Sequence, residues 1–237
     1  MTTATIEVST ADGPMAIFEA TPEAEPRGAV IVIQEAFGVN DHIEDVARRL
    51  AGEGYHAVAP ALFHRAGGGV APYDDFTKVM PLFDGVNDEA VLMDVDATIE
   101  HLHEAGFADS SIGIVGFCFG GRVTFLTASR RALGAGVGFY GGGITEANVL
   151  SPTALIEEAS QVKTPWLGLF GDLDEMIPVD GVEKLRTELE AAPVPTDVVR
   201  YADAGHGFHC DARDSYHPES AQDGWQRALA WFDTHLS

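Results

Sequence analysis

The sequence predicts an α/β fold with a mostly parallel central sheet and helices on both faces. Two kinds of segment alternate along the chain. Short runs that are apolar at nearly every position, such as Ala29–Ile33, are typical of strands covered on both faces in a parallel sheet. Longer segments with an apolar stripe at helical spacing, such as residues 41–51, lie between them. Because no internal repeat or linker divides the chain, we expect one domain over residues 1–237.

The individual elements follow in order. Residues 5–9 and 15–19 lie on either side of Ala-Asp-Gly-Pro, which predicts an opening hairpin. Further strands are expected at residues 29–33, 56–60, 112–115, 137–140, 166–170 and 196–201. Helices are expected at residues 41–51 and 87–105, from the turn at 115–121 to about 129, after 178, and from about 220. Residues 61–86 contain a Gly-Gly-Gly run and two prolines, which predicts an irregular excursion at the substrate site, with one short helix.

Composition excludes two classes of partner. Lys and Arg number 14 against 37 Asp and Glu, which gives a net charge of −23. Long-range repulsion then opposes binding to nucleic acid or to an anionic membrane. Two cysteines are too few for a disulfide framework and favour a reducing compartment. The N-terminal residues lack the pattern of a secretory signal, and no apolar run reaches the roughly 18 residues of a membrane span. We therefore expect a soluble, cytoplasmic protein.

Polar side chains follow the carboxyl ends of four predicted strands, where the functional residues of an open parallel sheet lie. Cys118 stands in Gly116-Phe117-Cys118-Phe119-Gly120, the G-x-S-x-G spacing of a strained strand-to-helix turn, with sulfur in the place of the serine oxygen. The other three loops contain Glu35, Asp172 with Asp174, and His206. The order nucleophile, acid, histidine matches the chain order of α/β-hydrolases.

The chemistry of each candidate follows from its type. The helix N-terminus expected beneath Cys118 favours a thiolate and lowers its pKa. His206 would pair with that thiolate and then donate its proton to the leaving group, while an acid orients the imidazole. We favour Asp174 as the acid, because it shortly precedes a hydrophobic-proline pair, and expect Asp172 to cap the loop. The expected oxyanion donors are the backbone N–H groups of Phe119 and Ala36.

Four stretches carry a resemblance to a known family: QEAFGVN at 34–40, GFCFGG at 116–121, GDLDEMIP at 171–178 and AGHGF at 204–208. Together they resemble the dienelactone hydrolase family, the carboxymethylenebutenolidase branch of the α/β-hydrolases, over nearly the whole chain. The resemblance implies an α/β-hydrolase fold and a triad of Cys118, His206 and Asp174, with Glu35 close to the sulfur in the resting enzyme. In that family the glutamate is thought to keep the thiol protonated until substrate displaces it, and then to take the thiol proton. The implied reaction is hydrolysis of an activated ester, such as a lactone, through an acyl-thiol intermediate.

The chain departs from the family where the substrate carboxylate binds. Members that open dienelactones hold this carboxylate with arginines, one of them four residues after the catalytic histidine, where this chain has Cys210. A second arginine comes from a stretch that corresponds to residues 66–86, which contain no arginine here. The candidate substrate contacts are Arg65, Lys78, Arg213, Phe37, Tyr140, Phe208 and Cys210. The identity of the substrate is therefore open.

Other residues have simpler explanations. A free cysteine is most often a small buried hydrophobic side chain, which is what we expect of Cys210. The spacing of His206, His209, Cys210 and His217 matches no usual zinc pattern, so we expect neither a metal ion nor a cofactor. The remaining histidines are expected on the surface or in loops: His56, His64, His101, His103 and His235.

Three functions remain in competition. The first is a cysteine-dependent hydrolase of a small ester or lactone. The second is a thioesterase or a broad carboxylesterase on the same triad. The third is a non-catalytic α/β-hydrolase scaffold that binds a small ligand, although a binding module has no need of a complete Glu, Cys, Asp and His set. In each case we expect a monomer or a small homo-oligomer.

Overall fold

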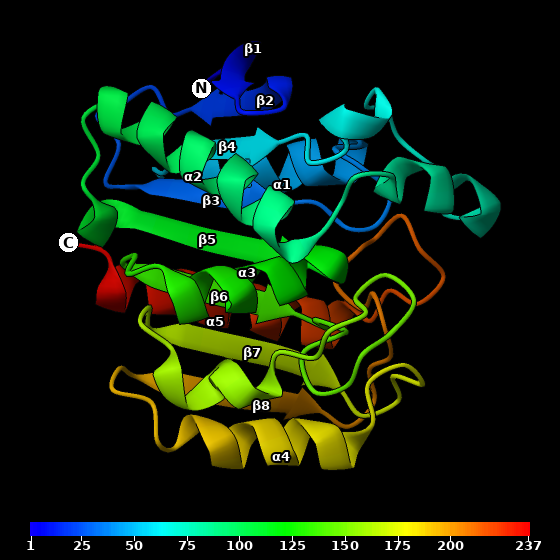
Figure 1. The fold of residues 1–237 in the computed structure, drawn as a ribbon. Coiled ribbons are helices and arrows are strands. Elements are labelled where there is room, and N and C mark those ends of the chain that lie inside the picture. The colour runs from blue at the N-terminus through cyan, green and yellow to red at the C-terminus, as the bar shows by residue number, and fades with distance from the viewer.

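The computed structural model describes residues 1–237 and contains one eight-stranded sheet, shown in Figure 1. The strand order is β1-β2-β4-β3-β5-β6-β7-β8. The pairs β1–β2 and β2–β4 are antiparallel, and every pair from β4 to β8 is parallel. The strands are β1 Thr2–Thr10, β2 Gly13–Thr21, β3 Ala29–Ile33, β4 His56–Pro60, β5 Ile112–Phe117, β6 Ala135–Phe139, β7 Trp166–Gly171 and β8 Thr196–Tyr201. The predicted parallel α/β class is confirmed.

Five α-helices cover this sheet. In Figure 1, α2 and α3 lie in front of the sheet, and α1 and α5 lie behind it. The helices are α1 Asp41–Gly52, α2 Asp88–Glu104, α3 Phe119–Arg130, α4 Val179–Leu189 and α5 Pro218–His235. Asparagine caps fix two of the starts, since Asn40 accepts a hydrogen bond from the Ile43 amide and Asn87 accepts from the Ala90 amide. None of these helices combines the length and the apolar character needed to cross a lipid bilayer.

The apolar strands divide the core into two layers. Successive side chains of a strand point to opposite faces, and β3 accordingly sends Val30 and Val32 into one apolar cluster and Ile31 and Ile33 into the other. The first cluster contains the apolar stripe of α1, and the second contains the stripe of α2. Burying a Val or Ile side chain fully stabilises the fold by about 1.5–3 kcal/mol. The prediction that β3 is covered on both faces is confirmed.

Backbone hydrogen bonds fix the start of three loops at the carboxyl edge of the sheet. The amide of Cys118, directly after β5, donates to Phe139 O at 3.0 Å. Directly after β6 the amide of Tyr140 donates to Leu169 O at 2.7 Å, and after β7 the amide of Asp172 donates to Tyr201 O at 2.9 Å. Each loop thus begins with a hydrogen bond to the neighbouring strand, which fixes the position of its first residue.

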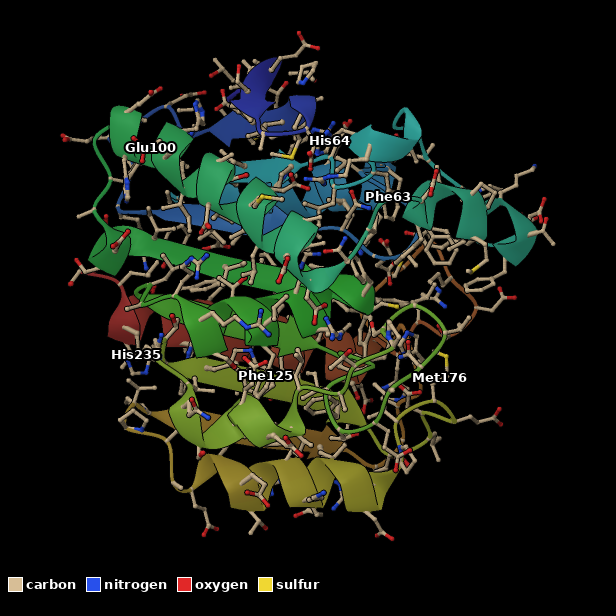
Figure 2. All side chains as sticks on the ribbon, viewed as in Figure 1. Phe63, His64, Glu100, Phe125, Met176 and His235 are labelled. Atoms are coloured by element: carbon tan, nitrogen blue, oxygen red, sulfur yellow. The ribbon has the colours of Figure 1, made fainter.

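Figure 2 shows where these loops gather. The labelled Phe63 and Met176, which follow β4 and β7, lie toward one side of the molecule, while Glu100 and His235, near the ends of α2 and α5, lie toward the opposite side. Consecutive parallel strands bring their carboxyl ends to a common edge. The candidate residues are therefore brought to one edge by the topology.

The excursion over residues 61–86 is irregular, as predicted, but contains three short 3-10 helices: His64–Ala66, Phe76–Lys78 and Met80–Phe83. It is fastened to α2 by the buried carboxylate of Asp94, which accepts two hydrogen bonds from Arg65, at 2.6 and 2.9 Å, and lies 3.1 Å from His64 Nε2. His64 lies in this excursion, as expected of a loop residue, but its side chain is only 7% exposed because this pairing draws it against Asp94. His56 is also buried, where it stacks on Phe107.

Candidate active site

Cys118 lies on a strained turn between β5 and α3. Its φ of 55° with ψ of −115° is a positive-φ conformation that costs a non-glycine residue about 1–3 kcal/mol. The turn is possible only with glycine on both sides. A Cβ on Gly116 would lie 2.2 Å from Gly120 O, and a Cβ on Gly120 would lie 2.4 Å from Ile33 O. The GFCFG spacing is thus required by close approach of the backbone to the end of β3, and it leaves the Cys118 side chain partly exposed.

Two backbone donors near this turn have no partner. The amide of Phe119 begins α3, and the amide of Ala36 follows β3; neither donates to an acceptor within the protein. Both residues are buried. The amide of a buried residue usually has a partner, because an unpaired donor costs free energy when it is removed from water. The pair is consistent with an oxyanion hole, in which the missing acceptor is a reacting oxygen.

His206 is held by Asp174. Its Nδ1 lies 2.7 Å from Asp174 Oδ2, and the other oxygen of this buried carboxylate accepts from the Met176 amide at 2.9 Å. Asp172, the competing aspartate, instead forms two hydrogen bonds with Arg200, both of 2.7 Å. The structure therefore places Asp174 against the histidine and gives Asp172 a separate ion pair.

The electrostatics around His206 favour its charged form. Burial on its own lowers the pKa of His206, but the neighbouring Cys118 sulfur and the Asp174 carboxylate raise it, to a net value of about 10. Its Nε2 is buried and has no hydrogen-bonding partner. An imidazolium at this position has an Nε2 proton available for transfer.

Glu35 is fully buried behind this edge of the sheet. Its Oε1 accepts a hydrogen bond from Arg213 Nη1 at 3.2 Å, whereas its Oε2 has no partner. The sulfur of Cys118 is not among its hydrogen-bonding partners. Arg213 thus binds one oxygen of the carboxylate, and the closeness of Glu35 to the Cys118 sulfur stays a prediction. A buried carboxylate without such a cation would cost several kcal/mol.

Aromatic rings hold Arg213 in place. Its guanidinium lies 5.6 Å from the ring centres of both Phe37 and Tyr73, within the range of cation–π attraction. The hydroxyl of Tyr73 accepts from Asn40 Nδ2 at 3.0 Å and lies 3.4 Å from the buried Cys210 sulfur. Arg213 also borders a hollow of about 540 Å³, lined by Tyr73, Asp74, Ala212, Arg213, Asp214 and Ser215.

Tyr140 is a second strained residue of the site, with a φ of 38°. Its ring lies 5.2 Å from that of His206 and 5.1 Å from that of Phe208. Its hydroxyl is buried without a partner, and burial, followed by the negative charge of Glu35, raises the pKa of this hydroxyl well above its usual value. Tyr140 therefore presents a protonated donor beside His206.

Two of the candidate cations have other partners. All hydrogen bonds of Arg65 go to Asp12, Asp94 and Ala90 O, and Lys78 is largely exposed beside Asp75. Neither is brought to the triad by a contact in the structure. No group of three or more His, Cys, Asp or Glu side chains is arranged to hold a metal ion.

Sequence patterns did not identify Tyr73 or Asn40. Both belong to loops, and their hydrogen bond joins residues that are 33 positions apart. The sequence offered only a weak signal for Tyr73, which is an aromatic residue next to a proline in the excursion expected at the substrate site.

The sheet order, the strained turn after β5, the acid after β7 and the histidine after β8 define an α/β-hydrolase. Residues 15–236 match the dienelactone hydrolase family. A relative from Methylorubrum extorquens, assigned as a carboxymethylenebutenolidase, is 40% identical over 231 residues, covering 96% of this chain and 79% of that protein. One from Bradyrhizobium, assigned as a 2-oxo-3-(5-oxofuran-2-ylidene)propanoate lactonase, is 32% identical over 214 residues, covering 88% and 84%.

A solved structure extends the comparison. The crystal structure of a protein assigned as a dienelactone hydrolase from Klebsiella pneumoniae is 40% identical and superposes with a TM-score of 0.88, covering 98% of this chain and 99% of that one. The chain therefore belongs to the dienelactone hydrolase family and is a hydrolase.

Proposed function

We propose that the protein hydrolyses an ester or lactone bond with Cys118 as nucleophile, through an acyl-thiol intermediate. The observation that carries the proposal is the convergence of a strained Cys118, a His206–Asp174 pair and two buried amides without partners. A packed core residue needs none of these features. Each of them matches one requirement of acyl transfer: a nucleophile, a proton carrier and a site for a developing oxyanion.

The proposed reaction has two halves. The Cys118 thiolate attacks the carbonyl carbon, and the carbonyl oxygen becomes an oxyanion that the amides of Phe119 and Ala36 stabilise. The C–O bond to the leaving group then breaks, and His206 gives its proton to the departing alkoxide. In the second half, His206 removes a proton from water, hydroxide adds to the acyl-thiol, and the acid departs while the C–S bond breaks. In a lactone, the alcohol and the acid remain parts of one product.

Glu35 would supply the thiolate when Cys118 starts as a thiol. Its Oε2 is a buried acceptor that receives no hydrogen bond, and Arg213 donates to the other oxygen. An anionic substrate that competes for Arg213 would release the carboxylate to take the thiol proton. Activation of the nucleophile would then depend on the presence of substrate.

Glu35→Gln is expected to slow acylation of Cys118 by about 10²-fold or more, the usual contribution of a positioned base. The measurement is the single-turnover rate with dienelactone, whose carboxylate can compete for Arg213, and far-UV circular dichroism shows whether the fold persists. Glu44→Gln is the matched control, since Glu44 pairs with Arg48 on the partly exposed side of α1. An unchanged single-turnover rate with dienelactone in Glu35→Gln would remove Glu35 from the mechanism.

We propose further that the acid part of the substrate carries a second carboxylate, which binds Arg213. Only one nitrogen of this guanidinium is engaged, by Glu35, and Arg213 borders the 540 Å³ hollow. The Bradyrhizobium relative bears the name of a lactonase whose substrate is a propanoate, which is a lactone with a carboxylate. Arg213 would thus take the place of the arginine that is absent from position 210.

Arg213→Gln is expected to raise KM for dienelactone by about 10- to 100-fold, the cost of losing a hydrogen bond to a charged group. The KM for neutral p-nitrophenyl acetate should change much less, because that ester has no carboxylate to anchor. Comparing the two substrates in the same variant removes any general effect of leaving Glu35 unpaired. Equal losses for both substrates would contradict a role for Arg213 in carboxylate recognition.

A further inference from the structure

A second hollow is bordered by the loop that carries His206. It measures about 320 Å³ and contains none of the catalytic candidates; its walls are Arg49, His209, Asp211, Tyr216, Pro218, Ala221, Gln222 and Trp225. The elements that meet there are the end of α1, the start of α5 and the loop between β8 and α5. None of Cys118, Asp174, His206 and Glu35 lines this hollow.

Arg49 is the unusual residue of this hollow. Every other arginine of the chain forms an ion pair with a carboxylate, whereas Arg49 forms none, although the chain contains 37 acidic residues. Its guanidinium lies instead 4.1 Å from the ring centre of Trp225. A guanidinium stacked on an aromatic face keeps all its N–H donors in its own plane, directed away from the ring. Arg49 is thus held in position with its donors free.

His209 provides an independent indication of a ligand. It is only 3% exposed, it lines the hollow, and its buried Nδ1 has no hydrogen-bonding partner within the protein. Its ring is packed against Phe117 and Phe139, with centroids 5.0 and 4.9 Å away, so it cannot turn freely to find one. Burial lowers the pKa of His209 well below 6.5, which leaves a neutral ring with one N–H donor. Buried polar groups of this kind are normally paired.

We infer that this hollow binds a planar aromatic monocarboxylate. Arg49 supplies a fork of donors that matches a carboxylate, and the rings of Trp225 and Tyr216 form apolar walls for an aromatic group. Asp211 in the same wall disfavours a ligand with more than one negative charge. The ligand would contact His209 and Asp211, on the same loop as His206 and Arg213.

Benzoate is the probe that tests this site, in a ¹H–¹⁵N NMR titration of the whole protein at about 0.15 M NaCl, where long-range repulsion is screened. The Trp225 indole N–H has no partner, whereas those of Trp166 and Trp231 donate to Thr124 and Pro165 and serve as internal references. Trp225→Phe assigns the peak. We expect a saturable shift of the Trp225 peak with a Kd on the order of 1 mM, as suits a ligand of this size.

Variants then locate the binding. Arg49→Gln should weaken the binding of benzoate at least about 10-fold, the effect of losing a charge-assisted hydrogen-bonded pair. Neutral benzamide should bind the wild-type protein correspondingly less tightly than benzoate. Arg48→Gln, the neighbouring arginine with the same charge change, should leave the Kd unchanged, as should Arg213→Gln at the catalytic edge. The assignment is overturned if the shift of the Trp225 peak does not saturate. It is also overturned if Arg48→Gln weakens benzoate binding as much as Arg49→Gln does, or if Arg213→Gln abolishes it.

Discussion

Cys118→Ala is expected to abolish both the burst and the turnover of p-nitrophenyl acetate, with kcat reduced by about 10⁴-fold or more. The methyl group cannot form an acyl-thiol, and the His206–Asp174 pair has no other nucleophile on the turn. The oxyanion amides and the substrate contacts would remain, so a small residual rate from water is expected. The experiment measures the burst amplitude against enzyme concentration and identifies the acylated residue by peptide mass.

The chain contains its own control for this experiment. Cys210 is the only other cysteine, it is buried, and its sulfur lies against Tyr73 rather than on a strained turn. Cys210→Ala should keep a burst of one equivalent. A full burst in Cys118→Ala, or acylation found on Cys210, would show that the nucleophile has been wrongly assigned.

Asp94→Ala is expected to lower the free energy of unfolding by about 3–5 kcal/mol, the usual cost of breaking a buried ion pair on one side. Asp94 is fully buried, and its loss leaves Arg65 and His64 facing an uncharged cavity. Because both partners belong to the excursion, its attachment to α2 should loosen as well. Urea unfolding followed by circular dichroism gives the free energy directly.

Asp96→Ala is the matched substitution on the same helix. Asp96 pairs with Arg131, but their side chains are 41% and 37% exposed, so solvent screens the interaction. We expect a loss of less than about 1 kcal/mol. If the two variants lose the same free energy, burial does not determine the strength of the Asp94 ion pairs.

The fold was predictable because its signals are local. An apolar run such as 29–33 needs two covered faces wherever it is placed, and the glycines around Cys118 are required by backbone contacts of less than 3 Å. The opening hairpin was predicted too short. The first residues of β1 are exposed on this edge strand, and they carry no apolar pattern to mark them.

The site was predictable only where sequence order determines position. Parallel strands deliver Cys118, Asp174 and His206 to one edge in a fixed order, whereas the ion pair of Glu35 with Arg213 joins residues 178 positions apart. The hydrophobic periodicity of a sequence does not predict an ion pair between two loops. The burial of the His64 side chain against Asp94 was not predicted from the sequence for the same reason.

In the proposed mechanism, the backbone hydrogen bonds after β5, β6 and β7 hold the reacting groups apart from the residues that would select the substrate. They tie the turn of Cys118 to β6 and the acid-bearing loop to β8, so these positions follow the spacing of the sheet itself. Tyr73 and Arg213, which form part of the wall of the 540 Å³ hollow, come instead from loops between elements. Changes of sequence or length in those loops can reshape the wall of the hollow. The reacting atoms then stay in place, because the sheet holds them. Evolution, or a protein engineer, can thus change what is cleaved without changing how it is cleaved.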